Sequence, residues 1–433
     1  MASIAIIGSG IAGLSAAYLL QDKHSVTLFE KEPRLGGHSR TITVKHGDRI
    51  IPVDTGFIVF NERNYPNLTA LFARLGVKVK NSDMTYAFTM RNGWFEWGAK
   101  ELNTIFGQRR NLLRPWYWRL LRDVARFNSE VVGRVANEPA ITLGQLINAM
   151  NLGENFKRYY LLPISGAIWS CPPDQMLAFP AQTFVNFFAN HSLLSMDGQP
   201  QWLTVDGGSQ QYVQKLTATL KRRPLNAVAA TRVRRSGNGV HIRDSGGSDT
   251  VFDHVVFACH SDQALALMAD PSEAERNALG AIRYQENQAI LHKDPRFMPR
   301  RRRCWSAWNY NAADEGKEPL VTLTYWMNKL QSIDEQYPLF VTLNPHSPVA
   351  DEDIFDATTF HHPVFDAAAI SAQKTLTNIQ GKRNTWFCGA YMRNGFHEDG
   401  LISAMAVAEK LGAGAPWLSH EPADAGLLAA AAG

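Results

Sequence analysis

The 433-residue sequence contains no run of 18 or more apolar residues, so it predicts no transmembrane helix. It also begins without the basic and apolar regions of a secretory signal, and we therefore expect no export. No histidine and carboxylate spacing resembles a metal site, and no G-x-S-x-G segment marks a serine nucleophile. Its few cysteines form no C-x-x-C pair and indicate reduced, mostly buried thiols in a cytoplasm: Cys171, Cys259, Cys304 and Cys388.

The sequence has little net charge, +4 at neutral pH, and no nucleic-acid-binding motif accompanies it, so we expect no nucleic-acid partner. Its basic residues gather in Arg109–Phe127, where six arginines alternate with Trp, Leu and Phe, and in Arg300–Arg303. Arginine beside Trp and Leu suits the headgroup layer of a membrane surface. An amphipathic helix packed on its own domain, with a solvated basic face, explains the same pattern. Both interpretations are open at this point.

The segment IAIIGSGIAGLSAAYLL, residues 4–20, places three glycines between an apolar run and a helical pattern. Gly8, Gly10 and Gly13 fit the G-x-G-x-x-G spacing. In that motif the first glycine makes a tight turn, the second admits a pyrophosphate, and the third lets the helix pack on the strand. The segment therefore predicts a strand, a turn and a helix whose N-terminus can hold a phosphate.

A second predicted strand, Ser25–Glu30, ends in an acid 22 residues after Gly8. A carboxylate at this position can accept hydrogen bonds from both ribose hydroxyls of an adenosine. The two segments together predict a dinucleotide site, although a plain strand-helix-strand turn is the alternative.

The segment KEPRLGGHSRT that follows resembles the R-x-G-G-R-x-x-[ST] signature of the flavin-dependent amine oxidase and phytoene desaturase superfamily. The resemblance implies that Arg34, Gly36 and Gly37 approach the phosphates and ribityl chain of a flavin. His38 stands where the superfamily usually has its second arginine, and Arg40 is close by. A simple Gly-Gly turn is the alternative interpretation.

The segment TWFCGAYMRNGFHEDGLISAMAVAEKL supports the same resemblance. It predicts an apolar strand, Trp386–Cys388, and a helix opened by Gly400 after a loop. In the superfamily this helix brings its N-terminus to the pyrimidine end of the flavin ring, where its dipole favours negative charge.

The resemblance implies an α/β fold with a Rossmann-like FAD-binding domain of the amine oxidase type and an interleaved α+β substrate domain. We assign residues 1–85, 205–282 and 381–415 to the FAD-binding domain, residues 86–204 and 283–380 to the substrate domain, and 416–433 to a loose tail. The implied cofactor is non-covalent FAD. Its predicted contacts are Gly8, Gly10, Ile11, Ala12, Gly13, Glu30, Lys31, Arg34, Gly36, Gly37, His38, Thr55, Gly56, Phe57, Ala230, Gly389, Asp399, Gly400 and Leu401.

Several other segments, among them PVDTGFIVFNERNYPNLTALFARLGV and GFHEDGL, are similar to bacterial flavoproteins that accompany cyclopropane-synthase-like lipid methyltransferases. A related protein of furan fatty acid synthesis is described as an acyl-chain desaturase. The resemblance implies a fatty acyl or lipid substrate and a methyltransferase partner. It also implies a cytoplasmic location with peripheral contact at the inner face of the membrane.

Two departures separate the sequence from the amine oxidases. Those enzymes place a lysine near flavin N5, where our alignment puts Asn287, and an aromatic cage residue where His397 falls. His397 and Glu398 are therefore the candidate catalytic residues, since imidazole and carboxylate can move protons. A polar helix N-terminus is the alternative explanation for this pair.

The leading hypothesis is an FAD-dependent oxidoreductase that desaturates a lipid acyl chain held in an apolar slot. The alternatives are a flavin amine oxidase, a redox-neutral isomerase, and a non-catalytic flavoprotein partner of a lipid methyltransferase. Five aromatic residues on strand-like segments either line the slot or belong to the core: Trp305, Trp308, Tyr310, Tyr325 and Trp326.

Overall fold

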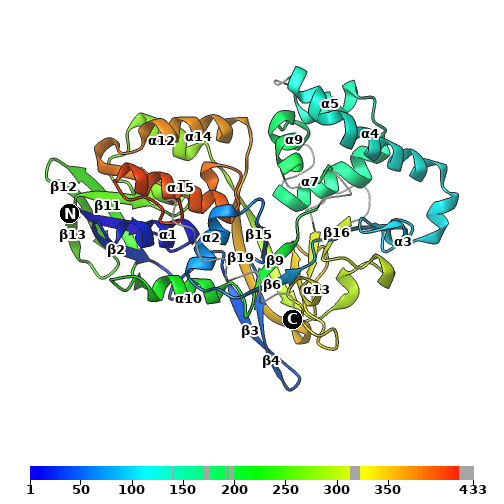
Figure 1. The fold of residues 1–433 in the computed structure, drawn as a ribbon, viewed down its shortest axis with the longest axis horizontal. Coiled ribbons are helices and arrows are strands. Elements are labelled where there is room, and N and C mark those ends of the chain that lie inside the picture. Colours follow the sequence, from blue (N-terminus) through cyan, green and yellow to red (C-terminus); the bar gives the residue numbers. More distant parts are fainter. Residues whose placement is uncertain (139–140, 170–175, 191–192, 195–198, 313–321, 419–433) are drawn as a thin grey trace.

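The computed structural model describes residues 1–138, 141–169, 176–190, 193–194, 199–312 and 322–418. The chain forms a mixed α/β fold with two lobes side by side, the first of which contains the N-terminus (Figure 1). Cys171 and residues 419–433 of the predicted tail lie outside the described residues.

The first lobe is built on a five-stranded parallel sheet. Alternate side chains of its central strand face opposite sides, as a pleated strand requires: Ile4 and Ile6 pack on one side, and Ala5 and Ile7 on the other. In spatial order the strands are β10 (Leu225–Asn226), β2 (Ser25–Glu30), β1 (Ser3–Ile7), β14 (His254–Phe257) and β20 (Thr385–Phe387).

Both faces of this sheet are covered, which explains why its strands are nearly all apolar. The Ile4 side packs against α1 (Ile11–Leu20), α2 (Pro66–Arg74), α10 (Gln210–Ala218) and α15 (His397–Lys410). The Ile7 side packs against a three-stranded antiparallel sheet and three helices: β11 (Ala230–Ser236), β12 (Gly239–Asp244), β13 (Asp249–Phe252), α11 (Ser261–Leu267), α12 (Glu273–Gly280) and α14 (Ala367–Ile379).

The second lobe is built on a seven-stranded sheet whose pairs are antiparallel, except for the parallel pair β16 and β7. In spatial order the strands are β19 (Ile354–Pro363), β15 (Tyr284–His292), β18 (Phe340–Leu343), β17 (Thr322–Trp326), β16 (Trp308–Ala312), β7 (Tyr86–Met90) and β8 (Phe95–Gly98).

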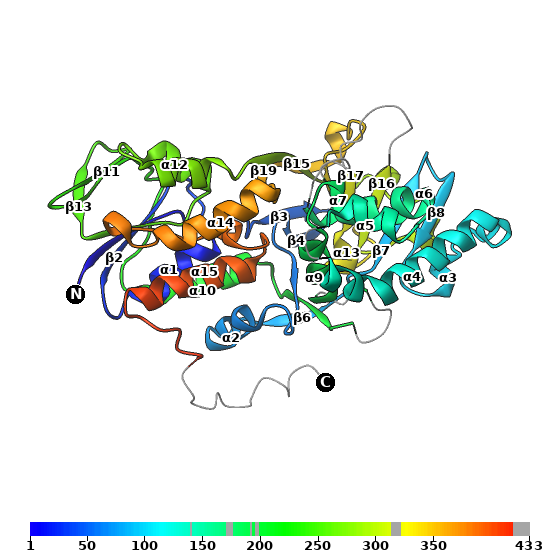
Figure 2. The ribbon, with the colours of Figure 1, turned by 90° about the horizontal axis from the view of Figure 1, so that it is seen from above.

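Helices from the middle of the chain lie beside this sheet and share one aromatic core with it (Figure 2). They are α3 (Leu102–Ile105), α4 (Pro115–Asn137), α5 (Leu143–Ala149), α6 (Glu154–Phe156), α7 (Leu162–Trp169) and α9 (Ala181–Asn190). The long helix α4 buries Tyr117, Leu120 and Phe127 and turns most of its arginines outward. The predicted amphipathic helix is thus confirmed, and its basic face is solvent-exposed.

The two lobes meet along β15 and β19, which lie between them in Figures 1 and 2. A two-stranded hairpin, β3 (Thr41–His46) and β4 (Arg49–Asp54), projects below this boundary, and a small sheet crosses it, formed by β5 (Val59–Phe60), β9 (Trp202–Val205) and β6 (Val79–Ser82). Arg40 pairs with Asp356 of β19 at 2.6 Å and so fastens the first lobe to the strand. The domain boundaries given above stay a prediction.

Two expectations are corrected by the structure. The last helix begins at His397 rather than Gly400, because Asp399 accepts the backbone N–H of Phe396 and caps the helix there. Trp305 follows a 3-10 turn, Arg302–Cys304, and is not on a strand. Within the basic run Arg300–Arg303, Arg301 pairs with the buried Glu96 and Arg302 pairs with Glu335.

Two structural findings bear on the expected location. No helix among the described residues combines the length and the apolar character needed to cross a membrane. Of the cysteines, Cys304 and Cys388 are buried, Cys259 is half-buried, and none of these three forms a disulfide.

Candidate cofactor and active site

The turn between β1 and α1 gives each of the three motif glycines a different physical role. Gly8 has a φ of +104°, a backbone conformation that other residues rarely adopt. A Cβ on Gly13 would lie 1.8 Å from the carbonyl oxygen of Gly8, so only glycine lets α1 pack this closely on the turn. A Cβ on Gly10 would meet nothing within 4 Å. The face of Gly10 is therefore open, as a cradle for a pyrophosphate requires.

The N-terminus of α1 fits an anion for a second reason. Gly10 is its N-cap and supplies no side chain to bond the first N–H groups, which come from residues such as Ile11 and Ala12. No acidic residue stands in its first turn. The uncapped N–H groups and the helix dipole therefore favour a phosphate at this end of α1.

The carboxylate of Glu30 is buried beside this turn. One carboxylate oxygen of Glu30 accepts hydrogen bonds from the N–H of Ser9 at 2.8 Å and from the Ser9 hydroxyl at 2.6 Å. The other oxygen accepts a hydrogen bond from the N–H of Glu32 at 2.9 Å. Lys31 is exposed. Ala230, at the start of β11, comes two residues after Val228, whose N–H donates to the carbonyl of Glu30.

The Gly-Gly loop lies directly against the α1 turn. A Cβ on Gly37 would come within 3.1 Å of the Cα of Gly10, and the N–H of Gly36 donates to the carbonyl of Ser9. Arg34 donates to the carbonyls of Gly37 at 2.8 Å and Ser39 at 3.0 Å. Arg34 thus fixes the loop from within, and its burial lowers the pKa of its guanidinium.

The segment Thr55–Phe57 holds the other side of this loop. The N–H of Phe57 donates to the carbonyl of His38 at 2.8 Å, and Gly56 packs against the same carbonyl. Thr55 accepts a hydrogen bond from Arg40, whose guanidinium also binds both oxygens of Asp356. Arg40 is therefore committed to Asp356 and does not replace the missing second arginine at the phosphates.

The N-terminus of α15 lies beside that of α1, since a Cβ on Gly400 would come within 2.8 Å of the Ile11 side chain. Leu401 is fully buried in the same core. The N–H of Gly389 donates to Ser403, and Asp399 accepts backbone N–H groups before the helix. Burial raises the pKa of Asp399 to about 6. Two helix N-termini thus converge on one place, and both favour negative charge there.

His397 and Glu398 have different surroundings, although they are neighbours in the chain. The imidazole of His397 stacks on Phe57 with ring centroids 3.8 Å apart, and a 2.9 Å hydrogen bond joins its Nε2 to Ser39. Burial lowers its pKa to about 3. Glu398 instead accepts hydrogen bonds from the side chain and N–H of Asn67 and the N–H of Leu68, and so it anchors α2.

The sequence reasoning missed a histidine cluster at the boundary between the lobes. The ring of His38 lies 5.4 Å from His362, 6.2 Å from His260 and 4.9 Å from Phe360. The Nε2 atom of His38 is buried and has no hydrogen-bond partner. The side-chain amide of Asn287 donates to Nδ1 of His362 at 3.0 Å.

Burial lowers the pKa of each of these imidazoles, to about 4 for His260 and His362, and the neighbouring histidines lower that of His38 further. The cluster is therefore neutral near pH 7. Residues 38, 260 and 362 come from three distant segments, and one signal could have pointed to His260: it follows a buried parallel strand, where ligand sites gather. No group of three or more His, Cys, Asp and Glu within the described ranges is arranged to hold a metal ion.

The open face of Gly10 gives a direct test of the cofactor site. Replacing it by a large residue, Gly10→Trp, should abolish FAD binding, because the indole would occupy the space that the pyrophosphate needs. The flavin content of the purified protein, measured by visible absorbance after denaturation, checks this. The matched control is Gly133→Trp on α4, where a Cβ also meets nothing within 4 Å, and it should leave the flavin content unchanged. Equal flavin in both variants would contradict the assignment.

The histidine cluster predicts a loss of stability in acid. A histidine whose pKa falls from about 6.5 to about 4 on folding contributes stability that is present above pH 6.5 and is lost as the pH falls toward 4. Between about pH 7.5 and pH 5 the wild type should therefore lose about 1 to 2 kcal/mol more unfolding free energy than His362→Gln. Urea unfolding at the two pH values measures the difference.

The buried carboxyls of Asp54 and Asp399, with pKa values raised to about 6, act in the opposite direction. Because both proteins share these carboxyls, they cancel in the comparison. An identical acid loss in wild type and variant would show that His362 does not keep a lowered pKa in solution.

Comparison with solved structures shows the same fold in flavoenzymes. A fatty acid isomerase from P. acnes that produces CLA superposes with a TM-score of 0.68 over 94% of this chain and 98% of its own, at 19% identity. Cyclohexylamine oxidase from Brevibacterium oxydans superposes with a TM-score of 0.65 over 95% and 99% of the two chains, at 16% identity. At these identities the likeness concerns the fold.

The sequence itself is similar to AofH of Mycobacterium tuberculosis, a protein named as a flavin-containing monoamine oxidase, with 26% identity over 286 residues. That alignment covers 62% of this chain and 59% of AofH, less than two thirds of the relative's length. The family described as flavin-containing amine oxidoreductases matches residues 11–336, well over half of the chain. The protein therefore belongs to the family of flavin-containing amine oxidoreductases, whose members are FAD-dependent oxidoreductases, and its cofactor is FAD.

Proposed function

We propose that the protein is an FAD-dependent oxidoreductase that removes hydrogen from a lipid acyl chain. The observation that carries the proposal is the neutrality of the imidazoles gathered between the lobes, where Arg40 and Asp356 also neutralise each other in an ion pair. His38, His260, His362 and His397 all have lowered pKa values, and Asn287 is an amide. Such a site fits an uncharged hydrocarbon chain.

An amine substrate reaches a site as an ammonium ion and needs a negative partner or an aromatic cage. The carboxylates near the described site are engaged elsewhere: Glu398 binds α2, and Asp399 caps α15. The aromatic position expected of an amine oxidase is His397. These features favour an acyl chain, although AofH and cyclohexylamine oxidase keep amine oxidation as a second candidate.

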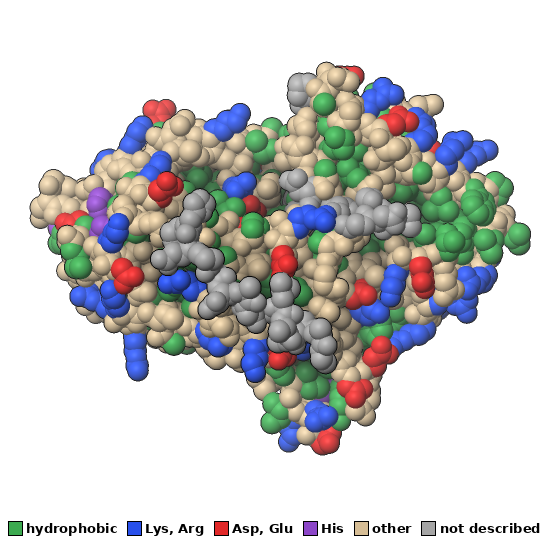
Figure 3. All heavy atoms as spheres, in the orientation of Figure 1, with side chains coloured by type: hydrophobic (Ala, Val, Ile, Leu, Met, Phe, Trp, Pro, Cys, Tyr) green, Lys and Arg blue, Asp and Glu red, His purple; other side chains and the backbone are tan. Residues whose placement is uncertain are grey.

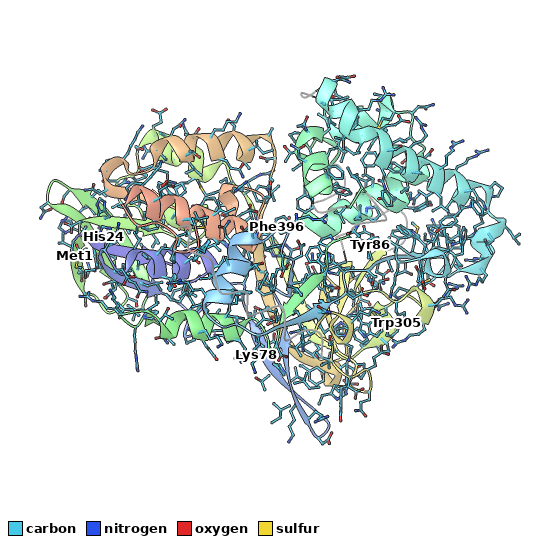
Figure 4. The ribbon with its side chains drawn as sticks, viewed as in Figure 1. Met1, His24, Lys78, Tyr86, Trp305 and Phe396 are labelled. Carbon is cyan, nitrogen blue, oxygen red and sulfur yellow. The ribbon has the colours of Figure 1, made fainter. Side chains whose placement is uncertain are left out.

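The surroundings of the boundary also suit an apolar substrate. Phe396, just before α15, lies between the two lobes in Figure 4. Its ring stacks on Phe187 of α9 with ring centroids 5.1 Å apart. Phe360 lies on the second lobe against His38. Of the five aromatics predicted to line a slot or fill the core, Tyr310 and Trp326 are core residues, and Trp305, Trp308 and Tyr325 are half-buried. Phe360 and Phe396 thus place aromatic rings at this boundary, where an apolar chain would find hydrophobic contacts.

Different residues of this chain would have different roles in such a reaction. Bound FAD would supply an acceptor for a hydride from the acyl carbon. The N-termini of α1 and α15, which lie side by side, would favour negative charge on a cofactor held between them. A proton must leave the adjacent carbon, and the neutral imidazole of His397 is the group that we propose to receive or orient it. Burial lowers the pKa of this imidazole to about 3, so near pH 7 the ring is neutral, with one N–H and one unprotonated nitrogen that can accept a hydrogen bond or a proton.

Anaerobic mixing tests the substrate class. The visible absorbance of oxidised flavin should decrease when the holoprotein meets saturated or monounsaturated fatty acids or phosphatidylglycerol, and aliphatic amines should leave it unchanged. Mass spectrometry should find the acyl product two hydrogens lighter, since both electrons and both protons leave the substrate.

The alternatives give different results. Reduction by amines alone would establish the amine oxidase candidate and overturn the proposal. An acyl product of unchanged mass, with the flavin still oxidised at the end, would indicate the isomerase. No change with either class of substrate would favour a flavoprotein partner of a lipid methyltransferase.

The role of His397 has its own test. His397→Phe keeps an aromatic ring stacked on Phe57 but removes both nitrogens, so flavin reduction by the acyl substrate should slow by roughly 100-fold. Stopped-flow absorbance measures the rate, and FAD content should stay normal. His241→Phe, on the distant strand β12, is the control and should reduce at the wild-type rate. An unchanged rate in His397→Phe would leave this residue a structural role only.

A further inference from the structure

Four large apolar side chains stand exposed at the outer end of the second lobe: Leu102, Leu112, Leu113 and Trp118, with 72, 45, 86 and 50% of their surface accessible. We call these residues the apolar tip. They come from α3, from a 3-10 turn (Arg109–Leu113) and from the first turn of α4. Figure 3 shows hydrophobic side chains gathered at this end of the molecule. Monomeric soluble proteins seldom expose such a cluster unless it contacts a partner.

The tip rests on a rigid base. The hydroxyl of Tyr117 donates to the carbonyl of Ile105 at 2.7 Å, and the indole N–H of Trp118 donates to the carbonyl of Leu112 at 3.0 Å. The ring of Trp118 also lies 5.1 Å from that of Phe106. The three elements are therefore fixed to one another, and the exposed side chains project from a preformed surface.

Positive charge surrounds the tip. Residues 100–122 contain six basic residues and a single acidic one, Glu101. Arg109 and Arg110 donate to backbone carbonyls, and Arg114 donates to Asn111 and stacks over Trp94 and Trp116. In the described part of the chain none of these three arginines pairs with a carboxylate. Lys and Arg side chains flank the green cluster in Figure 3.

We propose that the apolar tip docks this lobe on an anionic phospholipid bilayer. The leucines and the tryptophan enter the boundary between headgroups and acyl chains, and the arginines around them contact lipid phosphates. Apolar side chains with arginines beside them match the two layers of such a bilayer, an apolar interior and a negatively charged headgroup layer. This docking does not depend on the proposed reaction, and it would bring the protein to a source of acyl chains.

Vesicle sedimentation tests the docking directly. The FAD-loaded protein should sediment with vesicles in which a third of the phosphatidylcholine is replaced by phosphatidylglycerol. It should stay in solution with phosphatidylcholine alone, and raised salt should release it because salt screens exposed charges. The double variants Leu112→Ser/Leu113→Ser and Arg109→Glu/Arg110→Glu should each weaken the binding by about tenfold or more.

Matched controls use exposed residues elsewhere. Ile50→Ser, at the tip of the β3–β4 hairpin, and Arg222→Glu/Arg223→Glu, after α10, should bind like the wild type. Normal flavin content shows that every variant is folded. Equal binding to neutral and anionic vesicles, or no loss in the tip variants, would overturn the proposal. So would wild-type self-association that Leu112→Ser/Leu113→Ser abolishes, since the tip would then be an interface between copies of the chain.

Discussion

The close approach of backbone to backbone around Gly8 is the constraint on which the first lobe depends. Helix α1 can begin where it does only because Gly13 has no side chain to meet the carbonyl of Gly8. The Gly-Gly loop packs on the same turn, with Gly37 against Gly10. Helix α15 also packs there, with Gly400 against Ile11, the first residue of α1. Sheet, loop and last helix therefore converge on one small surface, where the open face of Gly10 leaves space that a pyrophosphate can occupy. The uncapped N–H groups are the chemical result of that packing.

The second lobe supplies the side chains that surround His38 beside this surface. Strand β19 brings Phe360 and His362 against His38, which stands where the superfamily resemblance implies an arginine, and Asn287 of β15 hydrogen-bonds His362. The exchange replaces a permanent cation with an imidazole that burial keeps neutral. A neutral ring can still donate one hydrogen bond and accept another. In the proposed reaction, the imidazoles of this boundary would offer hydrogen bonds without presenting charge to the substrate.

Features with local causes could be predicted from the sequence. The strand Ser25–Glu30 lies as expected, because its apolar pattern and its terminal acid suffice to define it. The start of α15 was wrong by three residues, since the capping by Asp399 decides it rather than the first glycine. His260 and His362 could not be foreseen as neighbours of His38, because His260 follows β14 of the first sheet and His362 lies on β19 of the second, so their approach depends on how the two lobes pack. The lowered pKa values of these two histidines result from their burial between the lobes, so they could not be predicted from the sequence either.

The bond between Arg40 and Asp356 links two regions that are far apart in the sequence. Arg40 lies two residues after His38 in the cofactor loop, and Asp356 lies on the strand that carries His362. Through this ion pair, a shift of the loop would be transmitted to the strand on the substrate side. Thermodynamic reciprocity then requires that any substrate held by this strand changes the retention of FAD by the same factor as FAD changes the affinity for that substrate. Cofactor loss and substrate release become coupled properties of one ion pair.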